Sequence, residues 1–502
     1  MFFILSTILA LSAGAMLMLS FAPIGFSLFA FISLILLLQI LHKQQLTRQS
    51  LWLGYCYGIG FFSSSISWIY VSIHAFSQSV FLGITLTIVF ILFLSLFFLV
   101  FGFFYIKLKN SYFVYRILLL PVTWLILELL RTHLFTGFPW VLLGYSQTHT
   151  FLSSFAPIGS VFLVGFVVCF IVICLSEIIN HIFQLRIVIS LISTIIICLL
   201  IAVSLQQIKW THSDGIEKSV SILQGKFIQN QKWDPSMLQT IINYYYTTTK
   251  DNLADLVFWP ENSISTFKTF IEPFLQQVED LGDTQKSAIL VGTVASNSED
   301  QYFNSAFVYG LGSGHYYKHN LVPFGEYFPF AYFIEPFIAY FNIPMSSFNK
   351  GDEVQPLLKM NGLSVALFIC YEIAYPSEVF SQLQNADLIV VISDDAWFGN
   401  SLAPWQHEEI SQMRAIETGR YLIQATNNGI TSIINPQGKV VASLPRNEQG
   451  VLKGKVYAMK GQTLWMTYGL LLSLIISLLS IFTSLIIFLY FKHSTGNNSR
   501  RL

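Results

Sequence analysis

The sequence contains little charge for its length. Only 11% of its 502 residues are charged, whereas soluble domains carry about 25%. Residues 1–206 contain just two acidic residues, Glu128 and Glu177. The acidic and basic totals are equal, so no strong positive field indicates a nucleic acid partner. With 54% hydrophobic residues, the composition predicts an integral membrane protein.

Cysteine is scarce in the polar part of the chain. Cys370 is the only cysteine between about Ala202 and Gln462, so an intramolecular disulfide within that stretch is excluded. The other four lie in apolar runs and are Cys56, Cys169, Cys174 and Cys198. A lone thiol of this kind is either a small buried hydrophobe or a nucleophile. It directly follows Leu363–Ile369, an apolar run that predicts a buried strand ending at the thiol.

Several motifs of ligand-binding proteins are missing. The sequence has no glycine-rich phosphate loop, no internal repeat and no low-complexity linker. His315, His319 and His407 lack the spacing typical of a zinc site. We therefore expect neither a cofactor nor a metal ion.

Long apolar runs are abundant. A membrane span needs about 20 apolar residues, and eight segments qualify: 2–20, 26–42, 51–73, 79–106, 114–131, 153–178, 186–206 and 464–491. The first segment lacks the basic start and the cleavage site of a signal peptide. The sequence thus predicts a bundle of seven transmembrane helices in 1–206, a soluble domain in 207–463, an eighth transmembrane helix in 464–491 and a tail in 492–502.

Basic residues in the short loops predict the orientation of these spans. Nine fall on one side: Lys43, Arg48, Lys107, Lys109, Arg116, Arg186, Lys492, Arg500 and Arg501. Arg131 is the one basic residue in a short loop on the other side. Because basic loops stay in the cytoplasm, both termini and the 492–502 tail are predicted to be cytoplasmic. In a bacterial inner membrane, the 207–463 domain is then periplasmic.

The soluble domain has an alternating pattern of strands and helices. The predicted strands are 219–223, 255–259, 288–292, 303–309, 363–369, 387–392, 421–425, 431–434 and 451–456. The predicted helices are 236–250, 269–281, 376–384 and 405–417. This alternation predicts an α/β fold in which helices cover sheets.

Three polar residues stand at or just beyond the ends of β-like segments: Glu261, Lys318 and Cys370. Active sites of α/β folds gather at such strand ends. A carboxylate can take the proton of a thiol, an ammonium group can stabilise an oxyanion, and a thiolate can attack an acyl group. The alternative is a surface Glu, a surface Lys and a core Cys, because any α/β domain contains these residue types.

Short motifs surround these three residues along the chain. They are Gln224-Gly225, Lys232-Trp-Asp-Pro235, Phe258-Trp-Pro-Glu-Asn262, Lys318-His-Asn-Leu-Val-Pro-Phe-Gly-Glu326, Cys370-Tyr-Glu372, Asp395-Ala-Trp-Phe-Gly399, Pro404-Trp-Gln-His407, Glu417-Thr-Gly-Arg420 and Thr426-Asn-Asn-Gly429, with Thr136-Gly-Phe-Pro-Trp140 and Gly144-Tyr-Ser-Gln147 in the apolar half. They resemble the nitrilase superfamily, whose domain is an αββα sandwich. Together with eight spans, they resemble its membrane-embedded apolipoprotein N-acyltransferase family. Asp394 departs from the pattern, which has Asn there.

The resemblance implies a role for each of the three residues. Glu261 would be the general base, Lys318 would stabilise the oxyanion, and Cys370 would be the nucleophile. Four further residues are implied to support the site or bind substrate: Glu326, Tyr371, Glu372 and Trp233. Of these, Glu326 would position Lys318 or Cys370. The Tyr371 N–H would add to the oxyanion hole, and Trp233 would lie near the substrate entrance.

The implied reaction moves a fatty acyl chain between two lipid-anchored partners. A phospholipid donor, expected to be phosphatidylethanolamine, would acylate Cys370, and the thioester would pass the chain to the amine of a diacylglyceryl-cysteine on an apolipoprotein. We expect a monomer. The alternative enzyme is a membrane-tethered nitrilase-type amidase for a small amide. A transporter or receptor is disfavoured because the membrane half has so few charges.

Three other features leave alternatives open. The aromatic residues Phe324, Tyr327, Phe328, Phe330, Tyr332 and Phe333 form either core or a lid that enters the membrane. Glu128 and Arg131, spaced i, i+3, form either a structural pair or a contact to a lipid headgroup or to the loop carrying Trp140. Glu417 and Arg420 are interpreted as a buried structural pair.

Overall fold

The chain forms two compact units. The computed structural model describes residues 2–77, 79–299, 301–323, 325–327, 348–383 and 385–498. The helical unit comprises 1–67, 87–208 and 467–502, and the sandwich unit comprises 68–86 and 209–466. Each unit is described by itself. Six aromatic residues from Phe324 to Phe333 are predicted to form either core or a lid. Of these six, only Tyr327 lies within the described residues.

The helical unit contains the apolar helices. They are α1 (Phe2–Leu17), α2 (Leu28–His42), α3 (Thr47–Ser65), α5 (Val80–Lys109), α6 (Phe113–His133), α7 (Ala156–Asn180), α8 (Leu185–Gln206) and α16 (Leu471–Asn498), with the first turns of α5 in the sandwich unit. Among the described residues, six helices are long and apolar enough to cross a membrane. A seventh candidate is the pair formed by α3 and α4 (Ile69–Ser77), which is bent by 57°.

Four of the eight predicted segments differ from one helix of spanning length with the predicted start. Helix α7, in the predicted span 153–178, contains non-helical backbone at Gly159 and Ser160. Helix α2 has only 15 residues, which is short for a bilayer of ordinary thickness. The predicted span 51–73 breaks after Ser65 because α4 packs in the sandwich unit, where the Ser72 hydroxyl donates to the carbonyl of Trp397 at 3.0 Å. The last span starts at Leu471, since Gly469 takes a positive φ of 57° between α15 (Leu464–Tyr468) and α16.

Glu128 and Arg131 both hold the loop that carries Trp140. The Glu128 carboxylate accepts from the backbone N–H of Leu143 at 2.7 Å, and the Arg131 guanidinium donates to the carbonyl of Trp140 at 2.7 Å. Their own charged groups are 3.9 Å apart and both side chains are buried. The interpretation as a contact to this loop is therefore confirmed.

The sandwich unit is built on two sheets, each with seven strands in the described part of the chain. The first sheet contains β1 (His212–Gln224), β2 (Leu256–Phe258), β3 (Ile264–Phe267), β4 (Ala288–Ser296), β5 (Tyr302–Gly310), β7 (His315–Tyr317) and β14 (Gly450–Lys460). The second contains β6 (Gly312–Ser313), β8 (Leu358–Met360), β9 (Leu363–Ile369), β10 (Leu388–Ser393), β11 (Leu422–Thr426), β12 (Thr431–Ile434) and β13 (Val440–Leu444). All nine predicted strands are confirmed.

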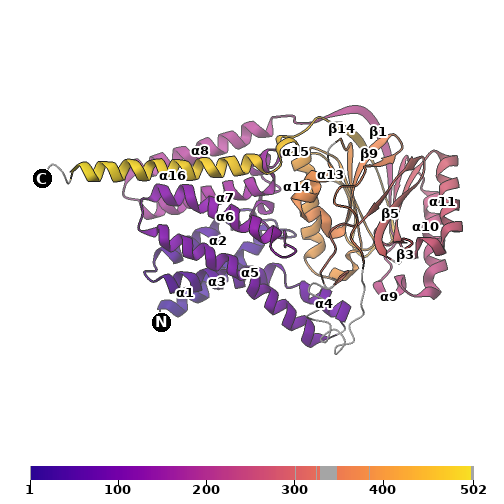
Figure 1. Ribbon diagram of the computed structural model, residues 1–502, viewed down its shortest axis with the longest axis horizontal. Helices are drawn as coiled ribbons and strands as arrows, with labels where there is room; N and C mark the ends of the chain where they lie inside the picture. Colours follow the sequence, from indigo (N-terminus) through magenta and orange to yellow (C-terminus); the bar gives the residue numbers. More distant parts are fainter. Residues whose placement is uncertain are drawn as a thin grey trace. The chain divides into compact units, whose positions relative to one another are not determined.

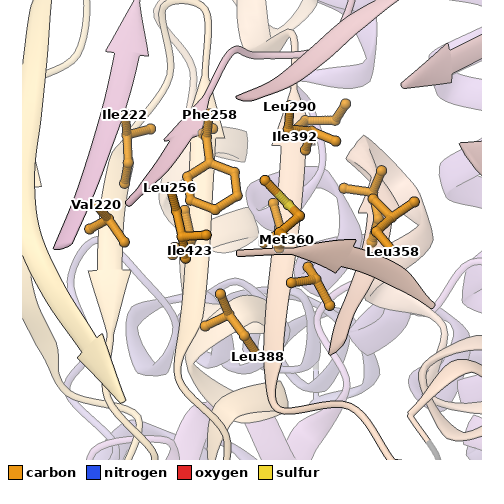
Figure 2. Packing of buried hydrophobic residues seen from close by; sticks show 14 of the residues in the cluster. Val220, Ile222, Leu256, Phe258, Leu290, Leu358, Met360, Leu388, Ile392 and Ile423 are labelled. Carbon is orange, nitrogen blue, oxygen red and sulfur yellow. The ribbon is translucent and has the colours of Figure 1, made fainter. Parts of the chain in front are cut away.

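Period-2 alternation separates the two faces of each sheet. On β2, Leu256 and Phe258 belong to the core between the sheets, whereas Val257, and Trp259 just after the strand, belong to the core under the outer helices. Figure 2 shows Leu256 and Phe258 in the first of these cores, which also contains Ile392 and Ile423 of the second sheet. Each such fully buried side chain contributes about 1.5–3 kcal/mol.

Helices cover the outer faces and complete the αββα arrangement (Figure 1). Helices α10 (Leu238–Asp251) and α11 (Glu272–Gln285) pack on the first sheet, and α14 (Ala403–Thr418) packs on the second, with α13 (Pro376–Gln382) beside it. All four predicted helices are confirmed. The strands not predicted are β3, β6, β7, β8 and β13, which have two to five residues each. Each has residues that are not buried, whereas the equally short predicted strands β2, β11 and β12 are buried and apolar enough to stand out.

The predicted pairing of Glu417 with Arg420 is wrong, although both side chains are buried. Glu417 pairs with Arg414, three residues earlier on α14. Helix α14 ends at Gly419, which has a φ of 60°, so the chain turns before Arg420. The Arg420 guanidinium donates instead to the carbonyls of Ala386 and Gly461, both at 2.7 Å.

Candidate active site

Cys370 occupies a sharp turn between a strand and a helical segment. Strand β9 ends at Ile369, and the 3-10 helix η6 (Cys370–Ala374) begins with the cysteine. Its φ of 56° is left-handed, a conformation that costs a non-glycine residue about 1–3 kcal/mol and is concentrated at functional sites. The residue is only 8% exposed. The nucleophile candidate is therefore held in a strained and sheltered position.

The thiol of Cys370 does not ionise readily by itself. Burial raises its pKa well above the ordinary value, and the negative charge of Glu261 raises it further, while the charge of Lys318 opposes the rise. A thiol in this setting needs a base to become a nucleophile.

Lys318 is a buried cation between two carboxylates. It follows β7, and its backbone N–H donates to the carbonyl of Asn304 at 2.8 Å. Its ammonium lies 3.4 Å from an oxygen of Glu261 and 2.9 Å from one of Glu326. Burial alone would lower the pKa of Lys318, but the charges of Glu261 and Glu326 outweigh it and raise the pKa. The residue is thus a fixed positive charge.

Glu261 is held by a hydrogen bond on each carboxylate oxygen. It lies just after β2, and its Oε1 accepts from the side-chain amide of Asn304 at 2.7 Å. Its Oε2 accepts from the backbone N–H of Asp394 at 2.8 Å. These bonds fix the carboxylate beside Lys318, and its charge acts on the Cys370 thiol. The sequence prediction that Glu261, Lys318 and Cys370 come together agrees with this geometry.

Asn304 is a site residue that the sequence did not reveal. It lies on β5, is buried, and its side-chain N–H₂ donates to Glu261 and to Glu326, both at 2.7 Å. It therefore joins the two carboxylates that flank Lys318. The sequence offers one weak signal, a polar residue inside a strand-like run.

Substitution of Asn304 should test this bridging role. Asn304→Asp places a third carboxylate against Glu261 and Glu326, so we expect turnover to fall by about 10²-fold or more, because like charges in a buried site repel strongly. Asn304→Ala removes the donors without adding charge and should cost about 10-fold. Steady-state rates of both variants provide the measurement. Equal losses for Asp and Ala would contradict an electrostatic role.

Glu326 and Glu372 have different settings. Glu326 bonds the ammonium, and its Oε2 accepts from the backbone N–H of Val322 at 2.8 Å. Glu372 is fully enclosed and accepts from the backbone N–H groups of Ile369 and His319, both at 2.7 Å. Glu372 thus ties the end of β9 to the segment after Lys318, and it supports the backbone rather than the reacting atoms.

Glu372 should give the protein a pH-dependent stability. Burial raises the pKa of Glu372 to about 7 although three backbone N–H groups act against it, whereas an unfolded glutamate titrates near about 4.3. Since the folded pKa is the higher one, this stabilisation is complete below the unfolded value and is lost as the pH rises through about 7. Between these values, the free energy of unfolding should fall by about 1.4 kcal/mol per pH unit. Glu372→Gln should flatten that slope in thermal unfolding followed from about pH 5 to 7.5, and an unchanged slope would refute the assignment.

Tyr371 and Trp233 are the more exposed of the predicted residues. Tyr371 is partly buried, and its hydroxyl accepts from Tyr375 at 2.8 Å. Trp233 is 47% exposed. With the Gln229 amide oriented to satisfy its neighbours, the indole N–H of Trp233 donates to that amide at 2.8 Å, and the amide donates to Asp394 at 3.1 Å. A chain of bonds therefore links Trp233 to the loop that holds Glu261.

Asp394 carries a charge where the family pattern has a neutral side chain. Its carboxylate forms a buried ion pair with Lys232 at 2.5 Å and accepts from Asn427 at 3.0 Å. Its backbone N–H still bonds Glu261. The local loop contact is thus retained, and the extra charge is balanced by Lys232.

The arrangement supplies a nucleophile, a base and a fixed cation. Among the described residues, no group of three or more His, Cys, Asp and Glu side chains is placed to hold a metal ion. Such a set suits acyl transfer through a thioester, since the thiol attacks, the carboxylate moves a proton and the cation stabilises an oxyanion.

Comparison with known proteins places the chain in a family. Residues 13–174 match the family model described as the apolipoprotein N-acyltransferase N-terminal domain, and residues 202–462 match the carbon-nitrogen hydrolase model. A solved carbon-nitrogen hydrolase from Helicobacter pylori G27 aligns with 48% of this chain and 89% of its own, at 15% identity and a TM-score of 0.37, too low a likeness to argue from.

The fold and the site define a protein of the carbon-nitrogen hydrolase class, joined to apolar helices typical of a multi-pass membrane protein. The chain is 38% identical over 467 residues to the apolipoprotein N-acyltransferase of Coxiella burnetii, covering 91% of this chain and 95% of the relative. It is also 36% identical over 468 residues to the apolipoprotein N-acyltransferase of Azotobacter vinelandii, and the match covers 91% of this chain and 90% of that relative. The chain therefore belongs to the apolipoprotein N-acyltransferase family and is an acyltransferase of lipoprotein biosynthesis.

Proposed function

We propose that this protein transfers a fatty acyl chain from a phospholipid, with phosphatidylethanolamine the expected donor, to the N-terminal amine of diacylglyceryl-cysteine on apolipoproteins. The product is a mature triacylated lipoprotein. The observation that carries the proposal is the convergence of Glu261, Lys318 and Cys370, in which the charges of the first two act on the thiol of the third. Family membership supplies the acceptor class.

The first half-reaction acylates the enzyme. Glu261 takes the proton of the Cys370 thiol, and the thiolate attacks the ester carbonyl of the phospholipid. The Lys318 ammonium, together with the Tyr371 N–H, stabilises the resulting oxyanion. When the oxyanion collapses, the ester C–O bond breaks and the proton on Glu261 passes to the departing oxygen. A lysophospholipid leaves and the acyl chain remains on sulfur.

The second half-reaction returns the thiol. The amine of diacylglyceryl-cysteine attacks the thioester carbonyl, and Lys318 again stabilises the oxyanion. The C–S bond breaks, the amide forms, and Glu261 carries the amine proton to the departing thiolate. The two substrates thus react in turn at one site, which is a ping-pong scheme. Glu326 and Asn304 keep Lys318 beside Glu261 in both steps, and Trp233 lies near the substrate entrance.

The same proposal assigns the parts of the chain. Residues 1–206 and 464–491 would cross the bacterial inner membrane as eight helices, residues 207–463 would form the periplasmic catalytic domain, and 492–502 would be a cytoplasmic tail. The protein would act as a monomer. Basic residues in the loops support this orientation.

Surface labelling should test the orientation. Ser298→Cys lies on an exposed loop of the sandwich unit, and Gln45→Cys lies in an exposed loop of the helical unit that the basic residues assign to the cytoplasm. In intact spheroplasts, a membrane-impermeant maleimide should label the variant at 298 and leave the one at 45 unlabelled until the membrane is opened. The parent protein reports the background of its own cysteines. The reverse pattern would overturn the predicted topology.

Mass spectrometry of the purified protein incubated with phosphatidylethanolamine tests the function itself. We expect a fatty acyl thioester on the peptide that contains Cys370, released when a diacylglyceryl lipopeptide is added, with the chain then found on the lipopeptide amine. A membrane-tethered amidase for small amides is the alternative. Turnover of small amides with no thioester from phospholipid would favour it and reject the transfer reaction.

A further inference from the structure

A buried histidine beside the nucleophile has no part in the reaction as written. His407 lies on α14 and is 0% exposed. Its Nε2 is 3.2 Å from the carbonyl oxygen of Cys370, and its Nδ1 is 3.5 Å from a carboxylate oxygen of Asp395. Asp395 is 2% exposed and begins the 3-10 helix η7 (Asp395–Phe398). The same carboxylate oxygen accepts from the Ser393 hydroxyl at 2.6 Å.

The contact to Cys370 requires a particular arrangement of the ring. A carbonyl oxygen can only accept, so the Nε2 that faces Cys370 carries the hydrogen of this bond. The Nδ1 on the other edge of the ring faces the carboxylate of Asp395 at 3.5 Å, and this contact orients the ring.

The ring cannot serve as the base for the thiol. One of its nitrogens faces a carbonyl and the other faces Asp395, which leaves no nitrogen for Cys370 Sγ. What the ring does hold is the peptide unit between Cys370 and Tyr371. In a trans peptide the C=O and the next N–H point in opposite directions within one plane. Fixing the carbonyl of Cys370 therefore fixes the direction of the Tyr371 N–H.

We propose that His407, oriented by Asp395, is a positioning residue that directs the Tyr371 N–H toward the oxyanion. This inference rests on the proposed function only in naming the oxyanion. The bond between the ring and the carbonyl is a property of the fold.

Two substitutions of His407 separate the two contacts. His407→Gln places an amide N–H₂ near the position of Nε2, so it retains the bond to the Cys370 carbonyl. His407→Asn reaches only the position of Nδ1, so it retains the contact to Asp395 and loses the carbonyl. Both side chains are neutral and polar, which makes each the control for the other.

The expected result is a selective loss of acyl transfer. With His407→Asn, thioester formation at saturating phospholipid should slow by about 10- to 100-fold, because an oxyanion donor is misdirected rather than removed. In His407→Gln, the rate of thioester formation should stay within about 3-fold of the parental rate, well above the rate of the His407→Asn variant. Alkylation of Cys370 by iodoacetamide forms no oxyanion, so its rate should change little in either variant. Equal acylation rates in the two variants, or a parallel loss of alkylation, would overturn the proposal.

A spectroscopic measurement keeps the test independent of the reaction. In the parent protein labelled with ¹⁵N-histidine, the His407 signals should show a protonated Nε2. They are assigned by the loss of one set of signals in His407→Gln, or, if that variant does not fold, by elimination with Gln variants of the other histidines. An unprotonated Nε2 would refute the carbonyl bond. Absence of a thioester in the parent would instead reject the proposed function, while the ¹⁵N signals would still decide whether Nε2 carries a hydrogen.

Discussion

Cys370→Ala should abolish N-acylation of apolipoprotein, with a fall in rate of about 10⁴-fold or more, as expected for loss of a covalent nucleophile. No side chain at position 370 could then hold the acyl chain, so the thioester adduct should disappear from the mass spectrum. The fold should survive, because the residue is small and Ala occupies most of its volume. Thermal unfolding of the variant therefore provides the check that activity, and not structure, is lost.

Another cysteine provides the matched control. Cys198→Ala changes a half-buried cysteine of the helical unit, and it should retain both the thioester and the activity. Cys370→Ser is the finer variant, since its hydroxyl is a far weaker nucleophile than the thiol and should also fail to accumulate an acyl-enzyme. Lipoprotein N-acylation by Cys370→Ala near the parental rate would exclude the proposed mechanism.

Lys318→Met should cost both activity and stability. Loss of an oxyanion donor lowers turnover by about 10²- to 10³-fold. The ammonium is buried between Glu261 and Glu326, so its removal leaves two carboxylates near each other without a counter-ion. Breaking a buried ion pair in this way destabilises a protein by about 3–5 kcal/mol. Turnover and thermal unfolding of the purified variant measure the two effects separately.

A second substitution should separate the two losses. Lys318→Met combined with Glu326→Gln removes one of the uncompensated charges, so part of the stability should return while turnover stays low. Lys455→Met provides a surface comparison, because Lys455 forms an exposed pair with Glu217 at 2.6 Å and its loss should change neither quantity measurably. A Lys318→Met protein with parental turnover would show that the cation is not needed for the oxyanion.

The features of the site that could be predicted from the sequence are those that depend on neighbouring residues in the chain. Glu261 and Cys370 each follow a run of buried β-forming residues, and the strand-end rule brings such residues to one edge of a sheet. Lys318 follows a β-like segment that forms a strand of only three residues. The alternation of strands and helices predicted an α/β fold in which helices cover sheets, and the resemblance to the nitrilase superfamily implied the αββα order of the layers.

The groups that hold the three residues depend on pairing between distant segments. Asn304 reaches Glu261 because β5 lies beside β4, which lies beside β2. The Asp394 N–H reaches the same carboxylate from the opposite sheet. His407 reaches Cys370 because α14 packs behind β11 and against η6. No local pattern specifies such contacts, since they join residues that are 37 or more positions apart.

The break between α3 and α4 has a consequence for exchanging parts between relatives. The ring of Trp68, just before α4, packs edge-on against Phe398 at 5.1 Å, and Ser72 bonds the carbonyl of Trp397. Both contacts fall on η7, the segment that begins with Asp395. A chimera in which the parent protein changes at the start of the 209–466 segment would therefore pair η7 of one protein with α4 of another. Residues 68–86 belong to the same compact unit as residues 209–466. A chimera should therefore take both segments from the same parent protein.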